Sequence, residues 1–170
     1  MNLGLGGKAA LITGGAGGIG SATARLFAQQ GIAVALFDRD GEGAERVATE
    51  LRSEGGTAIA GTMDVRDLDA FTAAVARTES ELGGLDFIVS VAGGGTRQTL
   101  STLSIEDWHA VIDLNLTGPF NAIKAGAPAP RRRGHRHRGL AGRPAHVDEQ
   151  RRELHGGEGW RHRPHAACRL

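Results

Sequence analysis

Five glycines stand among residues 14–20, directly after the short apolar run Ala9–Ile12. Residues 21–30 have the composition of a helix, so the stretch predicts a strand, a tight turn and a helix. Glycine permits backbone dihedrals that are closed to other residues, and it lets backbone N–H groups approach a ligand. A helix starting near Gly18 would aim its unpaired N–H groups and positive dipole end at the same point. An anionic pyrophosphate is therefore the expected ligand, although such a turn by itself is also compatible with a loop that binds nothing.

A second apolar run, Ile32–Phe37, ends in Asp38 and Arg39. A carboxylate at the carboxyl end of the second strand can accept hydrogen bonds from ribose hydroxyls and repels a 2′-phosphate. Asp38 therefore favours NAD as the cofactor. Arg39 leaves NADP open, because a neighbouring guanidinium can hold a phosphate. A solvated turn residue is the alternative interpretation of Asp38.

The spacing of the glycine turn, Thr13-Gly14-x-x-x-Gly18-x-Gly20, differs from the GxGxxG pattern of other dinucleotide folds. It resembles the fingerprint of the short-chain dehydrogenase/reductase family. This resemblance implies an NAD(P)-dependent oxidoreductase that moves hydride between nicotinamide and the carbonyl or alcohol of a small-molecule substrate. It also implies cofactor contacts along the turn, at Thr13, Gly14, Gly17, Gly18, Ile19 and Gly20.

Two later segments are similar to the same family. In the family, a pair like Asp64-Val65 meets the adenine ring, and its carboxylate accepts a hydrogen bond from the exocyclic amine. Ser90-Val91-Ala92-Gly93 lies where the family usually has Asn-Asn-Ala-Gly, at the point where the backbone passes the cofactor ribose. The resemblance therefore implies cofactor contacts at Ser90, Ala92 and Gly93, with both asparagine side chains replaced.

Asn115 lies inside a helix that the capping box Ser104–Asp107 is expected to open. Asparagine is a poor helix former, so its place in this helix calls for a reason. The resemblance implies that Asn115 bends the helix and holds a water molecule in the proton relay to the catalytic lysine. A plain surface asparagine is the alternative interpretation.

The family's reaction needs a serine, a tyrosine and a lysine four residues after the tyrosine. The tyrosine phenol is the general acid or base, the lysine lowers its pKa and binds the nicotinamide ribose, and the serine holds the substrate carbonyl. The 170 residues contain no tyrosine, and Lys8 and Lys124 are the only lysines. Asn115 is then the one surviving member of the catalytic set. We expect a chain that binds the cofactor but has little or no turnover.

Apolar runs alternate with helical segments through the first 127 residues, a pattern typical of a parallel sheet buried on both faces. The expected strands are residues 9–12, 32–37, 57–63 and 85–90. We predict an α/β fold for residues 1–127: a Rossmann-type doubly wound parallel sheet, truncated after about four strands. Family members usually assemble through later elements, so a family-type oligomer is not expected.

Residues 128–170 have a different composition. Residues 1–130 contain nine basic and fifteen acidic residues, whereas residues 131–170 contain eleven arginines, four acidic residues and six of the seven histidines. The run Arg-Arg-Arg-Gly-His-Arg-His-Arg at residues 131–138 cannot pack inside a sheet, because burying unpaired charges is too costly. We therefore predict a basic tail of low order in place of a fifth strand.

The genetic code offers an explanation for this tail. Our hypothesis is that, from a point between residues 128 and 134, the chain is a translation displaced by one nucleotide from its ancestral frame. Read one base over, residues 134–142 can become Gly-Ile-Val-Ile-Val-Ala-Ser-Leu-Ala, a buried strand that runs into the serine motif. Residues 153–159 can become Asn-Tyr-Thr-Ala-Ala-Lys-Ala, which places the tyrosine over Leu154 and the lysine over Glu158, four residues apart.

Two other interpretations of the tail stay open. As a nucleic-acid-binding arm, eleven arginines would bind phosphates without sequence specificity and with steep salt dependence. As a metal site, His135, His137 and His146 lack convincing ligand spacing, and no metal is expected.

The compartment is predicted from the remaining composition. The single cysteine, Cys168, cannot form an internal disulfide, which favours a reducing environment. The sequence shows neither a signal-peptide pattern nor an apolar run of membrane-spanning length. We expect a cytoplasmic protein that does not associate with membranes.

Overall fold

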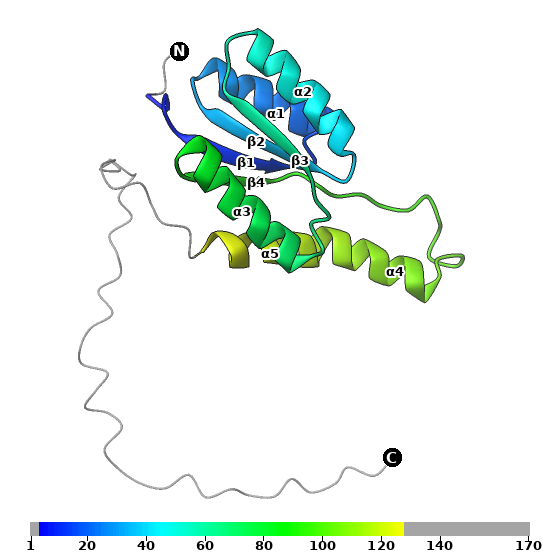
Figure 1. Cartoon of the computed structure of the whole chain (residues 1–170). Helices are drawn as coiled ribbons and strands as arrows, with labels where there is room; N and C mark the ends of the chain where they lie inside the picture. Colours follow the sequence, from blue (N-terminus) through cyan, green and yellow to red (C-terminus); the bar gives the residue numbers. More distant parts are fainter. Residues whose placement is uncertain (1–3, 128–170) are drawn as a thin grey trace, which may run out of the picture. The chain divides into compact units, whose positions relative to one another are not determined.

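The computed structural model describes residues 4–127. Within them, one parallel sheet contains the strands β1 (Ala9–Thr13), β2 (Ala33–Asp38), β3 (Ala58–Thr62) and β4 (Phe87–Ser90), in the order β3-β2-β1-β4 (Figure 1). This confirms the predicted fold class, a Rossmann-like α/β sheet. The predictions for the tail, residues 128–170, lie outside the described residues.

Helices connect the strands and follow the last one. They are α1 (Gly18–Gln29), α2 (Gly41–Ser53), α3 (Leu68–Leu82), α4 (Ile105–Ile112), the π-helical turn η1 (Asp113–Thr117) and α5 (Gly118–Gly126).

Side-chain caps explain where three of these helices begin. Asp40, Asp67 and Ser104 precede α2, α3 and α4, and each side chain accepts a hydrogen bond from a backbone N–H of the first turn. Each cap thereby satisfies donors that have no partner inside the helix. The prediction that a capping box at Ser104 opens a helix agrees with this geometry.

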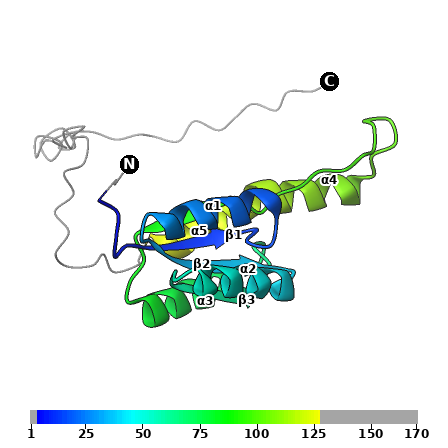
Figure 2. The ribbon, with the colours of Figure 1, turned by 90° about the horizontal axis from the view of Figure 1, so that it is seen from above.

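The sheet is covered on both faces, as expected for a doubly wound fold. Ile12 and Leu36 pack with α1 and α2 on one face, whereas Leu11 and Phe71 belong to the cluster with α3 and α5 on the other. Neighbouring residues such as Leu11 and Ile12 serve opposite faces because side chains alternate along a strand. The helix α4 extends away from the sheet (Figures 1 and 2).

Burial falls off toward the β4 edge of the sheet. All five residues of β1 are buried, but Phe87, Ile88 and Val89 of β4 are only half-buried and Ser90 is exposed. Among the described residues β4 has a strand on one side only, since it pairs with β1 at the end of the strand order. The strand β4 is therefore buried less completely than β1.

Candidate functional site

The carboxyl ends of the strands meet at one edge of the sheet. The register pairs Thr13 with both Phe37 and Ser90, and it pairs Asp38 with Thr62. The loops that leave these strands therefore lie side by side. The strand order also reverses at β1, and ligands of open α/β sheets bind in the crevice outside the carboxyl ends at such a reversal.

The glycine turn allows three backbone segments to pack directly on one another. Gly14 has a φ of 70°, and a Cβ built on it would lie 2.9 Å from the backbone nitrogen of Ala92. A Cβ on Gly20 would overlap the carbonyl oxygen of Gly14, which also accepts a hydrogen bond from the Gly17 N–H at 3.1 Å. A side chain at Gly14 would push the turn away from the exit of β4, and a side chain at Gly20 would push α1 away from the turn.

The first turn of α1 is open toward solvent. A Cβ on Gly18 would meet no atom within 4 Å, and Ile19 is 74% exposed. Gly17, the residue before α1, provides no side-chain cap, and the first turn of the helix contains no acidic residue. The N–H groups and the positive end of the helix dipole are thus accessible to an anion. These residues fit the pyrophosphate of a dinucleotide.

Thr13 connects β1 to the exit of β4. Its side chain is fully buried, and its hydroxyl oxygen accepts hydrogen bonds from the N–H groups of Val91 and Ala92, both at 3.2 Å. This hydroxyl holds the Ala92 segment against Gly14. Thr13 therefore positions the Ala92 segment, which borders the predicted site. The direct contact predicted between Thr13 and the cofactor stays a prediction.

Asp38 lies at the end of β2, beside the glycine turn. One carboxylate oxygen accepts a hydrogen bond from the Ala16 N–H at 3.1 Å, and the other accepts one from the Asp40 N–H at 3.0 Å. A carboxylate offers about four acceptor positions, so two are left for other donors such as hydroxyls. Arg39 is exposed beside it.

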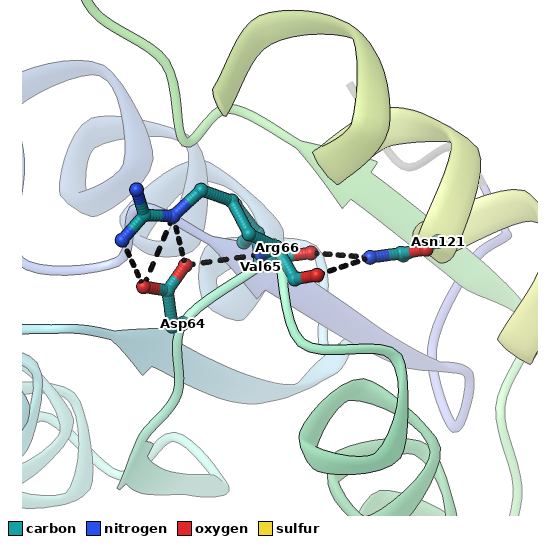
Figure 3. Close-up of polar contacts among 4 residues, drawn as sticks. All are labelled: Asp64, Val65, Arg66 and Asn121. Atoms are coloured by element: carbon teal, nitrogen blue, oxygen red, sulfur yellow. Dashed lines mark hydrogen bonds and ion pairs between the residues drawn. The ribbon is translucent and has the colours of Figure 1, made fainter. Parts of the chain in front are cut away.

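Asp64 and Val65 lie in the loop after β3, where Arg66 pairs with Asp64 (Figure 3). Nε of Arg66 donates to both carboxylate oxygens, at 2.9 and 3.1 Å, and Nη2 donates to Oδ2 at 2.5 Å. These hydrogen bonds, followed in size by a backbone hydrogen bond and the charge of Arg66, lower the pKa of Asp64 to about 2 against the opposing effect of burial. Val65 is 4% exposed. The Asp64 carboxylate is thus ionised and fixed in orientation.

Asn115 lies in the π-helical turn and contacts the segment after β4. Its Nδ2 donates to the carbonyl oxygens of Gly94 at 2.6 Å and Val111 at 2.8 Å, while its Oδ1 accepts from the Gly94 N–H at 3.2 Å. A Cβ on Gly93 would lie 2.9 Å from Oδ1. Asn115 therefore fixes the backbone near Gly93. Ser90, another predicted contact, is exposed at the end of β4.

Two residues of this edge were missed by the sequence analysis. Arg66 fixes Asp64, and Asn121, which is 4% exposed, donates from α5 to the carbonyl oxygens of Val65 and Arg66. Asn121 shares a helical face with Gly118, Ala122 and Ala125, and an asparagine on such an apolar face is the signal that could have revealed it.

Within residues 4–127, the side-chain contacts of Lys8 and Lys124 lie away from this edge of the sheet. Lys8 precedes β1 at the opposite edge and pairs there with Asp86 at 3.1 Å. Lys124 is exposed on α5, with its Nζ 5.8 Å from the ring centre of Phe120.

Other kinds of site can be checked within residues 4–127. Over that range, no group of three or more His, Cys, Asp or Glu residues could hold a metal ion. None of the helices described there is long and apolar enough to cross a membrane.

The sheet, its order and the glycine turn define the class of Rossmann-type α/β proteins. The family model of the short chain dehydrogenases matches residues 8–138. The chain belongs to this family, whose members use a nicotinamide dinucleotide cofactor and act on small molecules.

Known proteins resemble the chain over about half of their own length. It is 43% identical to 2,3-dihydro-2,3-dihydroxybenzoate dehydrogenase of Bacillus subtilis (strain 168), over 72% of this chain and 47% of that protein. It is 37% identical to D-threitol dehydrogenase of Mycolicibacterium smegmatis, over 71% and 46% of the two chains. The crystal structure of a short-chain type dehydrogenase/reductase from Mycobacterium marinum matches with a TM-score of 0.71 and 35% identity, covering 74% of this chain and 51% of that one.

Proposed function

We propose that this chain carries the cofactor-binding half of an NAD-dependent oxidoreductase of the short-chain dehydrogenase family, and that it binds the cofactor with little or no turnover. The observation that supports binding is the open first turn of α1, where Gly18 faces free space and backbone N–H groups are available to a pyrophosphate. The intact parent would move hydride between nicotinamide and the carbonyl or alcohol of a small molecule.

The orientation of Asp38 supports NAD over NADP. Backbone N–H groups of Ala16 and Asp40 hold the carboxylate at the end of β2, beside the turn that would take the pyrophosphate. In this proposal its free acceptor positions receive the ribose hydroxyls, and its charge repels a 2′-phosphate. Arg39 is the residue that could partly offset this repulsion.

The remaining proposed contacts continue along the same edge. The Asp64 carboxylate accepts a hydrogen bond from the exocyclic amine of adenine, and Val65 lies against the adenine ring. Ser90, Ala92 and Gly93 pass the cofactor ribose, and Asn115 keeps that segment in place through Gly94.

Missing catalytic residues are the basis for proposing little turnover. The 170 residues contain no tyrosine, so no phenol can protonate the substrate oxygen. We propose that the tail is an out-of-frame translation, and the family match ends at residue 138, the last residue of the arginine-rich run 131–138. Sequencing the coding DNA tests this: read one base over, it must contain serine, tyrosine and lysine codons at Leu140, Leu154 and Glu158. DNA without them contradicts the frame-shift proposal.

Fluorescence titration of the full chain with NADH and NADPH tests the cofactor proposal. We expect tighter binding of NADH, and Asp38→Asn should weaken NADH binding about tenfold and narrow the difference between the two ligands, since a charged acceptor is lost. Asp40→Asn is the matched control, because it removes a nearby charge while keeping a good helix cap. Absence of affinity for both NADH and ADP-ribose contradicts the proposal. Equal affinities for NADH and NADPH contradict the role of Asp38.

A second candidate function rests on the eleven arginines of residues 131–170. They would let the chain act as a non-catalytic nucleic-acid-binding protein. Sequence-selective binding that persists at high salt would support this candidate. Binding that disappears at moderate salt would indicate only non-specific attraction to phosphate. The single cysteine supports a cytoplasmic location for either function.

A further inference from the structure

The buried amide of Asn121 joins α5 to the loop that follows β3. Its Nδ2 donates to the carbonyl oxygens of Val65 and Arg66, both at 3.0 Å, across more than fifty residues of sequence (Figure 3). Asn121 is only 4% exposed. A buried amide group that loses its partners carries a large desolvation cost, so these two bonds fix the loop relative to the helix.

A close contact from the same helix supports this connection. A Cβ built on Gly118, one turn before Asn121, would lie 2.9 Å from Cγ2 of Val65. The missing side chain lets α5 approach the loop closely enough for the Asn121 amide to reach both carbonyl oxygens. The loop is thus fixed on its buried side by packing at Val65 and by hydrogen bonds.

On its exposed side, the same loop fixes the carboxylate of Asp64. The Arg66 N–H donates to Oδ1 at 3.0 Å, and the Arg66 guanidinium contacts both carboxylate oxygens. Arg66 therefore holds Asp64 with its backbone N–H and its side chain, while its own carbonyl oxygen is held by Asn121. A continuous set of hydrogen bonds leads from the interior of α5 to the carboxylate.

We infer that Asn121 is a positioning residue for adenine recognition, acting on Asp64 through Arg66. The inference rests on the proposed function, in which Asp64 accepts a hydrogen bond from the exocyclic amine of adenine. Asn121 touches neither the ring nor the carboxylate. It sets the backbone from which the carboxylate is presented, so its loss should reduce the discrimination between bases more than the general affinity for a dinucleotide.

The test compares NADH with its hypoxanthine analogue, in which an oxygen replaces the exocyclic amine. For the full wild-type chain we expect NADH to bind at least about tenfold more tightly, because the analogue turns an acceptor toward the Asp64 carboxylate. In Asn121→Leu we expect this ratio to fall to about twofold. Both dissociation constants are measured by nicotinamide fluorescence on one sample, so the ratio does not depend on the fraction of folded protein.

Thr78→Val is the matched control. Thr78 is fully buried on α3, and its hydroxyl donates to Ala74 of its own helix, so the variant loses a buried hydrogen bond away from the loop. In Thr78→Val, the ratio of the dissociation constants of the analogue and NADH should equal the wild-type ratio. If Asn121→Leu does not fold, Asn121→Ser keeps a shorter donor and should give an intermediate ratio.

The outcomes separate the two proposals. Asn121→Leu or Asn121→Ser could weaken the binding of both ligands equally and leave the ratio of their dissociation constants at the wild-type value. That result would mean that Asn121 has a structural role only, and it would overturn the inference. Wild-type binding of both dinucleotides with equal affinity also overturns it, while leaving dinucleotide binding in place. Failure of the wild type to bind either ligand overturns the proposed function together with this inference.

Discussion

The described chain has two regions that differ in packing. The first region, residues 8–86, contains β1 to β3 with α1 to α3. The second region, residues 87–126, contains β4, α4, η1 and α5. Five residues of α3 are buried but none of α4, and the second region exposes large apolar side chains at Leu100, Ile105, Trp108, Leu116, Phe120 and Ile123.

This difference separates the proposed cofactor contacts as well. The glycine turn, Asp38 and Asp64 belong to the well-packed first region, whereas Ser90, Gly93 and Asn115 belong to the second. Stability in proteins is not uniform, and segments with few buried apolar contacts open at low free energy. We therefore expect the proposed contacts in the first region to be more rigid than those in the second region.

The largest expected effect compares two phenylalanines. Phe71 on α3 is fully buried, whereas Phe120 on α5 is 57% exposed. Phe71→Ala should lower the free energy of unfolding by about 3–5 kcal/mol through lost burial and a cavity. Phe120→Ala should change it by about 0.5 kcal/mol. Urea unfolding measures both, and comparable losses would mean that the two regions are equally well packed.

An intermediate effect is expected at the contact that joins the regions. Thr13→Val keeps the shape of the side chain but leaves the N–H groups of Val91 and Ala92 without their buried acceptor. The loss in unfolding free energy should be about 1–3 kcal/mol. Thr13→Ser retains the hydroxyl and should lose less, as measured by the same urea titration. A larger loss in Thr13→Ser than in Thr13→Val would show that the methyl group matters more than the hydroxyl and would contradict this prediction.

The smallest effect concerns the pH dependence of the Asp64–Arg66 pair. Arg66 lowers the pKa of Asp64 from the ordinary 3.8 to about 2, so the pair stabilises the folded chain above pH 4 and this contribution is lost as the pH falls toward 2. Both side chains are about one-third exposed, so solvent screening limits the contribution to less than about 1 kcal/mol.

Arg66→Gln tests this sign. Wild type and variant should differ in unfolding free energy at pH 7 and converge as the pH is lowered through 3 toward 2, with a smaller difference at high salt. Urea titrations at several pH values give the comparison. A difference that grows on acidification would contradict the assigned direction of the pKa shift.

The sequence was a good guide to local structure. The alternation of apolar runs and helical segments predicted four strands whose ends agree with the structure within a few residues, because the period of the apolar residues is a local property. The resemblance implied a bend at Asn115 in the helix expected from Ser104 to Leu116, but it did not predict that a π-helical turn lies there. There the Asn115 amide donates to both Val111 and Gly94, and the second contact comes from a different segment.

By itself, the sequence determined the glycine spacing, the order of strands and helices, the acid after β2 and the lack of any tyrosine. Only the tertiary structure decided that Thr13 faces the exit of β4 and that Asn121 donates to the backbone carbonyl oxygens of Val65 and Arg66. The physical reason is range: strand and helix periods are set by neighbouring residues, whereas the hydrogen bonds of a buried polar group depend on which distant backbone the packed core brings within 3 Å.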